Sequence, residues 1–251
     1  MHFETLAIHD GQAPDPHTGS VTVPVYQTST FGRDSLDHRS EFFYSRIGNP
    51  TRQALEAALA LLENGKYALA FASGVAATMA ALQVLKPGDH IVAGNDIYGG
   101  SYRIFEQLLR PWGVTTSYTE CESTESYAAC ITPATKLIWI ETPSNPLLQL
   151  SDIRALASLA KERGFLLAVD NTFASPYFQR PLELRRHCRT QHHQISWWPQ
   201  RCYRRRRGDV RHSDTHHHQK LSGCSGSRAR PLGLLADSAR FEDAENSHEG
   251  A

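Results

Sequence analysis

The sequence has 251 residues, of which 21% are charged, and its formal net charge is zero at pH 7. This length allows one large domain or two ordinary ones, and no apolar run is long enough to predict a membrane-spanning helix. The first residues, Met1 to Glu4, lack the basic and apolar regions of a signal peptide, so we expect a cytoplasmic protein without a membrane partner. The five cysteines form no C-x-x-C motif, which argues against a disulfide framework or a zinc knuckle.

The charges are distributed unevenly along the chain. Residues 1–184 contain 13 Lys and Arg against 19 Asp and Glu, whereas residues 185–251 contain 13 against 7 and hold eight of the 13 histidines. Such a basic tail often binds nucleic acid. The run Arg204–Arg207, however, has no interleaved aromatic residues, and the adjacent His216–His218 lack the spacing of a designed metal site. We therefore expect neither a nucleic-acid partner nor a metal.

The first 40 residues are predicted to be irregular, because glycines and prolines interrupt them. Such a long arm often reaches across a subunit boundary. A helix is expected at 51–63, where apolar residues at positions 55, 58, 59 and 62 form one buried face. Asn49 is a suitable N-cap for it, and Pro50 a suitable first residue.

Strands and helices are predicted to alternate from about residue 67 to 170. This alternation is typical of an α/β domain whose mostly parallel sheet is covered by helices on both faces. The expected strands are 67–72, 90–93, 114–119, 136–141 and 166–169, and the expected helices are 75–85, 102–109 and 153–163.

Several polar or small residues follow directly after these strands. In a parallel sheet the ends of the strands meet at one edge, where ligands bind, so Ser73-Gly74, Tyr98, Asn145 and Asp170 should converge there. The Ser73-Gly74 turn can offer a helix N-terminus to an anion, although this signal is weak alone. Tyr98 can stack on a planar ring or simply pack. For Asp170, capping of the next turn and pairing with a protonated cofactor ring nitrogen are about equally plausible readings, on the ordinary chemistry of turn carboxylates.

Five motifs in order closely resemble the Cys/Met-metabolism enzymes that depend on pyridoxal phosphate, and within them the trans-sulfuration enzymes. The resemblance covers about residues 4–184. Its motifs are Tyr44-Ser-Arg46 with Gly48-Asn-Pro-Thr51, Ala72-Ser-Gly-Val-Ala-Ala77, Asp96-Ile-Tyr-Gly-Gly100, Ile140-Glu-Thr-Pro-Ser-Asn-Pro146, and Val169-Asp-Asn-Thr-Phe173 with Pro176-Tyr-Phe-Gln-Arg-Pro181.

This resemblance implies a fold of the aspartate-aminotransferase type (fold type I) and pyridoxal 5'-phosphate as cofactor. Gly74 and Val75 would donate backbone N–H groups to its phosphate. Tyr98, the candidate catalytic residue, would stack on the pyridine ring. Asp170 would hold the ring nitrogen protonated.

The resemblance also assigns the remaining candidate cofactor-binding residues. Asn145 would contact the side of the ring that carries the phenolic oxygen, and Thr172 would line the ring. Tyr44 and Arg46 would reach the phosphate of a neighbouring subunit, which implies a homodimer or homotetramer. The substrate would be an amino acid, cystathionine or an activated homoserine, on which the enzyme performs γ-elimination or γ-replacement.

The resemblance stops near residue 184, before the lysine that forms the family's Schiff base with the cofactor. The only lysine after Asp170 is Lys220. Read one base later, codons for residues 192–196 can encode Thr-Thr-Lys-Tyr-Leu, which matches the family's lysine motif. We therefore expect residues 1–45 to form an arm, 46–184 a partial, truncated cofactor domain, and 185–251 a frameshifted, disordered, non-native tail. The alternative function is accordingly a catalytically dead fragment.

Overall fold

The computed structural model describes residues 2–9, 11–33, 35, 41–183 and 190–192. Within them, five parallel strands form one sheet in the order β2-β1-β3-β4-β5. The strands are β1 (His90–Gly94), β2 (Thr115–Thr119), β3 (Thr135–Glu141), β4 (Leu166–Asp170) and β5 (Thr190–His192). The predicted α/β class with a parallel sheet is thereby confirmed.

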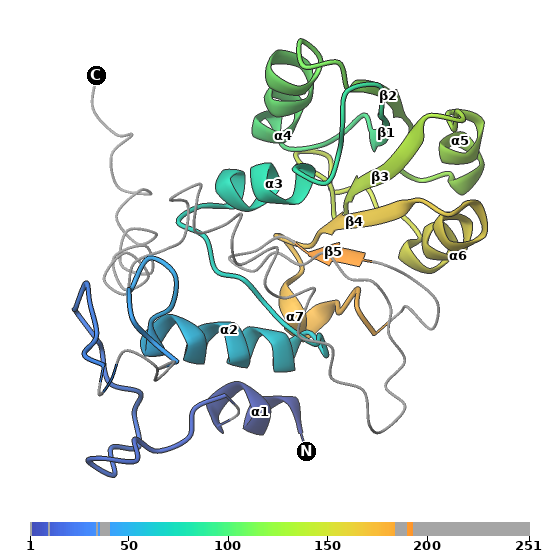
Figure 1. Cartoon of the computed structure of the whole chain (residues 1–251). Coiled ribbons are helices and arrows are strands. Elements are labelled where there is room, and N and C mark those ends of the chain that lie inside the picture. Colours follow the sequence, from blue (N-terminus) through green and yellow to red (C-terminus); the bar gives the residue numbers. More distant parts are fainter. Residues whose placement is uncertain (1, 10, 34, 36–40, 184–189, 193–251) are drawn as a thin grey trace, which may run out of the picture.

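Helices cover both faces of this sheet (Figure 1). One face packs against α3 (Gly74–Leu82), α4 (Gly99–Arg103) and the π-helix η1 (Ile104–Leu109), and the other against α5 (Thr124–Ala129) and α6 (Ile153–Arg163). Alternate residues of β3 serve the two cores: Leu137 and Trp139 face the first, and Ile138 and Ile140 face the second. Because both faces of the sheet are buried, the sequences of the central strands are continuous apolar runs.

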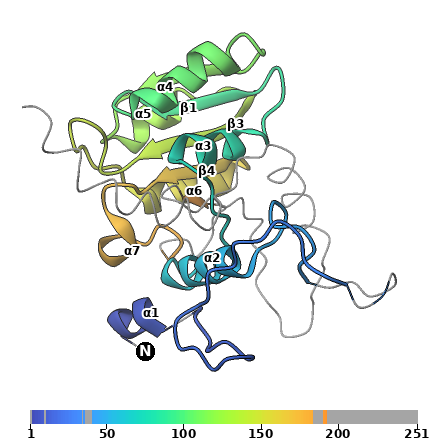
Figure 2. The same cartoon turned by 90° about the vertical axis from the view of Figure 1, so that its left-hand side faces the viewer.

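The N-terminal part lies beside the long helix α2 (Pro50–Leu62), and both views place it apart from the sheet (Figures 1 and 2). Asn49 caps α2 by accepting a hydrogen bond from the Thr51 N–H at 2.9 Å, as expected. The arm docks on the same helix end, where Thr51 Oγ1 donates to the Pro24 carbonyl and accepts from the Tyr26 N–H. The arm is not wholly irregular, since Phe3–His9 form helix α1, which contacts α2.

Two further predictions of secondary structure were wrong, and one short helix was not predicted. The strand expected at 67–72 is reduced to two bridge residues, Ala70 and Phe71, and the Ala70 N–H donates to the Glu56 carboxylate at 2.9 Å. The helix expected at 102–109 begins earlier, at Gly99, and widens into a π-helix whose end is marked by the Arg110 N–H bonding to the Phe105 carbonyl, five residues back. The short helix α7, at Ser175–Phe178, was not among the predicted helices.

The sequence after residue 184 shows no strand pattern, yet its backbone at Thr190–His192 forms β5. This strand pairs in parallel with β4, with Leu167 opposite Thr190 and Val169 opposite His192. The rest of the segment, including the arginine run, the three adjacent histidines and Lys220, lies outside the described residues.

Candidate functional site

The carboxyl ends of the central strands lie side by side at one edge of the sheet. Glu141, the last residue of β3, is in register with Asp170, the last residue of β4, and β1 runs parallel on the other side of β3. The loops that leave these strands carry Tyr98, Asn145 and Thr172. The structure therefore brings these candidate residues to the same edge as Asp170, which is the edge where parallel sheets bind ligands. Their roles toward a cofactor stay predictions.

Asp170 is buried, with 3% of its surface exposed. Its Oδ1 accepts hydrogen bonds from the Thr172 backbone N–H at 3.1 Å and from the Thr172 hydroxyl at 2.5 Å. The prediction that Asp170 caps the next turn is therefore correct for Oδ1. It does not exclude the second reading, because a buried carboxylate at a ligand-binding edge remains suited to face a cationic group.

Tyr98 is held by its backbone. Its N–H donates to Oε2 of Glu141 at 2.7 Å, a short bond to a carboxylate that is only 3% exposed. The Tyr98 ring itself is 43% exposed. A Cβ on Gly100 would come within 2.2 Å of Cε1 of this ring, so the ring packs directly against Gly100 in this position. The backbone of Tyr98 is therefore held by Glu141, and its ring packs on Gly100 while remaining accessible to a ligand.

The loop that carries Asn145 is held by a second buried carboxylate, Asp96. Its Oδ2 accepts a hydrogen bond from the Ser144 hydroxyl and another from the Leu147 N–H at 3.0 Å. Asp96 lies in the loop after β1 and holds the loop after β3, whereas Glu141 ends β3 and holds the loop after β1. We call these two residues the carboxylate clasp.

Sequence reasoning missed both residues of the clasp, although Asp96 and Glu141 each lie inside a motif that it singled out. A signal was present, since a carboxylate beside a buried strand must find a donor. The partners are 43 to 51 residues away in the chain, and nothing in the sequence pairs them.

The Ser73-Gly74 turn begins helix α3, as predicted. The Ser73 side chain caps the helix by accepting from the Ala76 N–H at 3.2 Å. The first N–H groups of a helix have no partner inside the helix and carry its positive end. Val75 is 40% exposed, and α3 contacts α4, which follows Tyr98 directly. That this start of α3 binds the cofactor phosphate stays a prediction.

Tyr44 and Arg46 lie elsewhere, in the loop that enters α2. The Arg46 guanidinium lies over the Tyr44 ring, 4.9 Å from its centre, and Tyr44 forms a β-bridge with Thr30. Arg46 is exposed. Tyr44 and Arg46 thus lie in the part of the chain beside α2, which both views place apart from the sheet that ends at Asp170 (Figures 1 and 2).

Four of the five lysines fall in the described part of the chain, and none of these four lies at the Asp170 edge. Lys86 precedes β1, Lys136 is the second residue of β3, and Lys161 lies in the last turn before β4, so all three lie at the opposite edge of the sheet. The Lys66 ammonium lies over the Tyr67 ring, 4.8 Å from its centre. An amine for covalent attachment of a cofactor is therefore not found among them.

The surroundings of the Cys121 thiol do not favour nucleophilic chemistry. Cys121 is buried, its thiol lies 3.8 Å from the Asp96 carbonyl, and burial raises its pKa above the ordinary value. A protonated, buried thiol is a poor nucleophile. Among the residues with described positions, no three His, Cys, Asp and Glu side chains are grouped to bind a metal ion, and no helix has both the length and the apolar character needed to span a membrane.

Comparison with known proteins gives a consistent result. A family model described as Cys/Met metabolism PLP-dependent enzyme matches residues 4–187. The chain is 48% identical over 182 residues to a probable cystathionine gamma-synthase of Herpetosiphon aurantiacus, covering 72% of this chain and 57% of that protein. It is 50% identical over 186 residues to a cystathionine gamma-lyase of Macaca fascicularis, covering 73% and 46%. A cystathionine beta-lyase of Coxiella burnetii is 46% identical over 184 residues, with coverage of 73% and 48%.

Solved structures resemble the fold as well. The cystathionine gamma-lyase from Lactobacillus plantarum, in complex with L-serine, matches with a TM-score of 0.82 at 36% identity, over 93% of this chain and 61% of that one. The chain spans about half the length of the curated relatives it matches. With the family model covering residues 4–187, the chain belongs to the Cys/Met metabolism PLP-dependent enzymes.

Proposed function

We propose that this chain carries the cofactor-binding half of a trans-sulfuration enzyme, which acts on cystathionine or an activated homoserine by γ-elimination or γ-replacement. The observation that carries the proposal is the arrangement of Tyr98, Asn145 and Asp170 on neighbouring loops at one sheet edge. Relatives named as cystathionine synthases and lyases support this substrate class.

The residues at this edge fit pyridoxal phosphate in three respects. The start of α3 at Gly74 and Val75 suits the phosphate, because helix N-termini bind anions. The half-exposed ring of Tyr98, which packs on Gly100, suits a planar pyridine ring. The buried carboxylate of Asp170 suits a protonated ring nitrogen.

When bound, the cofactor supplies an electron sink for carbanions formed from amino acids. The chain's own residues orient and hold it. Asp170 would keep a proton on the ring nitrogen, Tyr98 would stack on the ring, and Asn145 and Thr172 would contact it. The clasp, Asp96 with Glu141, keeps the loops of Tyr98 and Asn145 in register.

The site is completed by a second subunit in this proposal. Tyr44 and Arg46 lie in the part of the chain beside α2, so they would serve the phosphate of a neighbouring copy, as a homodimer or homotetramer requires. An arginine can form two parallel hydrogen bonds with a phosphate, which suits Arg46 to this task. The arm, residues 1–45, would then lie near the subunit boundary. The cytoplasm stays a prediction from the sequence.

A second candidate function is a fragment without catalytic activity. The four lysines at Lys66, Lys86, Lys136 and Lys161 are distant from the Asp170 edge or engaged elsewhere. In this reading a frameshift near residue 185 removed the attachment lysine from residues 185–251, and residues 46–184 keep only a partial cofactor domain.

Purified protein decides between the two functions. The intact-enzyme reading predicts a cofactor absorbance band that survives dialysis and release of 2-oxobutyrate from cystathionine. The fragment reading, which we favour for this chain as written, predicts neither. Resequencing the DNA across codons 180–190 tests the cause, and a reading frame identical to the present sequence would rule out a sequencing error there.

A further inference from the structure

Ser45, which lies between Tyr44 and Arg46, has all of its polar groups engaged. Its N–H donates to the Ser29 carbonyl at 2.8 Å, and its hydroxyl donates to the Thr28 carbonyl. The same hydroxyl accepts from the Asn49 side-chain amide at 3.2 Å. The loop around Tyr44 and Arg46 is therefore anchored at its middle residue, while Arg46 on its outer side remains exposed.

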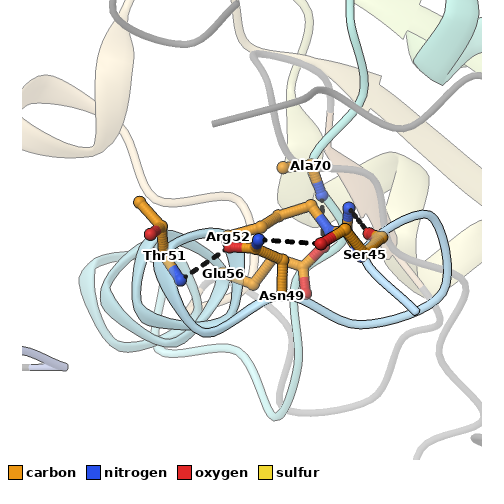
Figure 3. Close-up of polar contacts among 6 residues, drawn as sticks. All are labelled: Ser45, Asn49, Thr51, Arg52, Glu56 and Ala70. Atoms are coloured by element: carbon orange, nitrogen blue, oxygen red, sulfur yellow. Dashed lines mark hydrogen bonds and ion pairs between the residues drawn. The ribbon is translucent and has the colours of Figure 1, made fainter. Parts of the chain in front are cut away.

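The last group of Ser45, its carbonyl, accepts a hydrogen bond from Nη1 of Arg52 at 3.0 Å. The Arg52 side chain is only 3% exposed, and its Nε lies 3.7 Å from Oε1 of Glu56, one turn further along α2. Figure 3 shows these side chains between Ser45 and Ala70. A guanidinium buried to this degree requires a charged partner, and here one guanidinium serves both a carbonyl and a carboxylate.

Glu56 continues the connection. Its Oε1 accepts the Ala70 N–H at 2.9 Å, and Ala70 is fully buried. Four residues after Ala70 the chain reaches Gly74 and helix α3. An unbroken path of polar contacts thus runs from the Ser45 loop through Arg52 and Glu56 to the segment that leads into the anion-accepting start of α3.

We propose that Arg52 and Glu56 are positioning residues for phosphate recognition: they fix the loop of Tyr44 and Arg46 and connect it to the segment before Gly74. The inference rests on the proposed function, which assigns phosphate contacts to both ends of this path. A cation on a loop that is already rigid loses little conformational freedom when it binds an anion, so the buried pair raises affinity without contacting the ligand.

A purely structural role makes a different prediction. If Arg52 only stabilised the fold, its loss would weaken binding of every ligand in proportion to the folded fraction. If it positions phosphate contacts, its loss should weaken binding of pyridoxal phosphate and leave binding of pyridoxal, which has no phosphate, nearly unchanged. The ratio of the two dissociation constants separates the roles.

The experiment titrates the full chain with pyridoxal phosphate and with pyridoxal, following the quenching of its intrinsic fluorescence. Arg52→Ala should lower the preference for the phosphorylated compound about tenfold, the lower end of what outer-shell partners of a bound group typically contribute. Arg52→Lys keeps the charge but cannot serve Ser45 and Glu56 together, so its ratio should be intermediate. Glu56→Gln keeps an acceptor for Ala70 and should act in the same direction.

Arg110→Ala is the matched control, because Arg110 also pairs with a glutamate one turn away, Glu106, but its side chain is 71% exposed and far from this path in the sequence. Its ratio should equal that of the wild type. If Arg52→Ala does not fold, Arg52→Lys and Glu56→Gln carry the test. An unchanged ratio in these variants, with Arg46→Ala losing the preference, overturns the inference alone. A wild-type chain without any preference for the phosphorylated compound overturns both the inference and the proposed function.

Discussion

Asp96 holds the loop of Asn145, and replacing it by alanine tests how the carboxyl edge of the sheet is maintained. The change removes the acceptor of the Ser144 hydroxyl and of the Leu147 N–H. Ser144 is fully buried, so its hydroxyl loses a partner that water cannot replace. Leu147 is 67% exposed, so water can take over its N–H.

The difference in exposure between Ser144 and Leu147 decides how much free energy of unfolding is lost. A buried polar group left without its partner costs about 1–3 kcal/mol, whereas a solvent-accessible one costs little. We therefore expect Asp96→Ala to lower the free energy of unfolding by about 2 kcal/mol, nearly all of it from Ser144. Asp96→Asn keeps one side-chain oxygen as an acceptor, and we expect about 1 kcal/mol or less.

Urea denaturation followed by fluorescence measures both variants. Asp89→Ala is the control, because Asp89 also accepts a backbone N–H, that of Lys86 at 2.8 Å, but in an exposed turn at the opposite edge of the sheet. It should cost less than Asp96→Ala. If Asp96→Ala and Asp89→Ala destabilise the protein equally, Asp96 does not hold the Asn145 loop in the manner described.

Three further predictions follow from single contacts. Gly100→Ala should displace the Tyr98 ring and weaken pyridoxal phosphate binding about tenfold, by analogy with other outer-shell changes. Gly99→Ala is the control and should bind normally in the same titration, because a Cβ on Gly99 meets nothing within 4 Å. Equal binding by the two variants would contradict the geometry. Burial lowers the pKa of the His90 imidazole below 6.5, so the unfolded chain takes up this proton more readily, and stability should be complete above about pH 6.5 and decrease below it. Urea midpoints should therefore decrease between pH 8 and pH 5, and this dependence on pH should be weaker in His90→Gln. The same dependence on pH in the variant would refute the attribution to His90. Leu137→Ala, in the fully buried centre of the sheet, should cost about 3 kcal/mol in urea denaturation, and a loss below 1 kcal/mol would contradict its place in the core.

The central strands were predictable because of their burial. Strands β1, β3 and β4 are covered on both faces, so their residues form continuous apolar runs, and the predicted bounds differ from the observed ones by one residue at most. Helix α6 was predicted with its true bounds because Asp152 caps its start and Gly164, in the left-handed conformation, ends it.

Other elements depend on contacts that local sequence does not record. Helix α5 has only six residues and buries a single large side chain, Tyr127, so its periodicity is too short to recognise. The segment 67–72 was predicted as a strand but contains only two bridge residues, Ala70 and Phe71, and its Ala70 N–H donates to Glu56, which lies 14 residues earlier. At Ala70 a tertiary contact with Glu56 takes the N–H that a strand ladder would otherwise use.

The candidate site was predictable in part. The convergence of Tyr98, Asn145 and Asp170 was inferred from the predicted parallel sheet, since the ends of parallel strands share an edge. The supporting residues did not follow, because Asp96 and Glu141 act on loops that are distant in sequence. The predicted family, fold and cofactor are confirmed by the family match and the solved structures, whereas the individual residue roles stay predictions.

The central claim is that Asp170 contributes to a cofactor site at the carboxyl edge of this sheet. Titration of the chain and of Asp170→Ala with pyridoxal phosphate tests it most directly, with Asp152→Ala as the control, because Asp152 only caps α6. We expect saturable, dialysable binding by the wild type and by Asp152→Ala. We expect at least about tenfold weaker binding by Asp170→Ala, since a hydrogen bond to a charged group contributes about 1.5–3 kcal/mol. Equal affinity of the wild type and Asp170→Ala would contradict the claim.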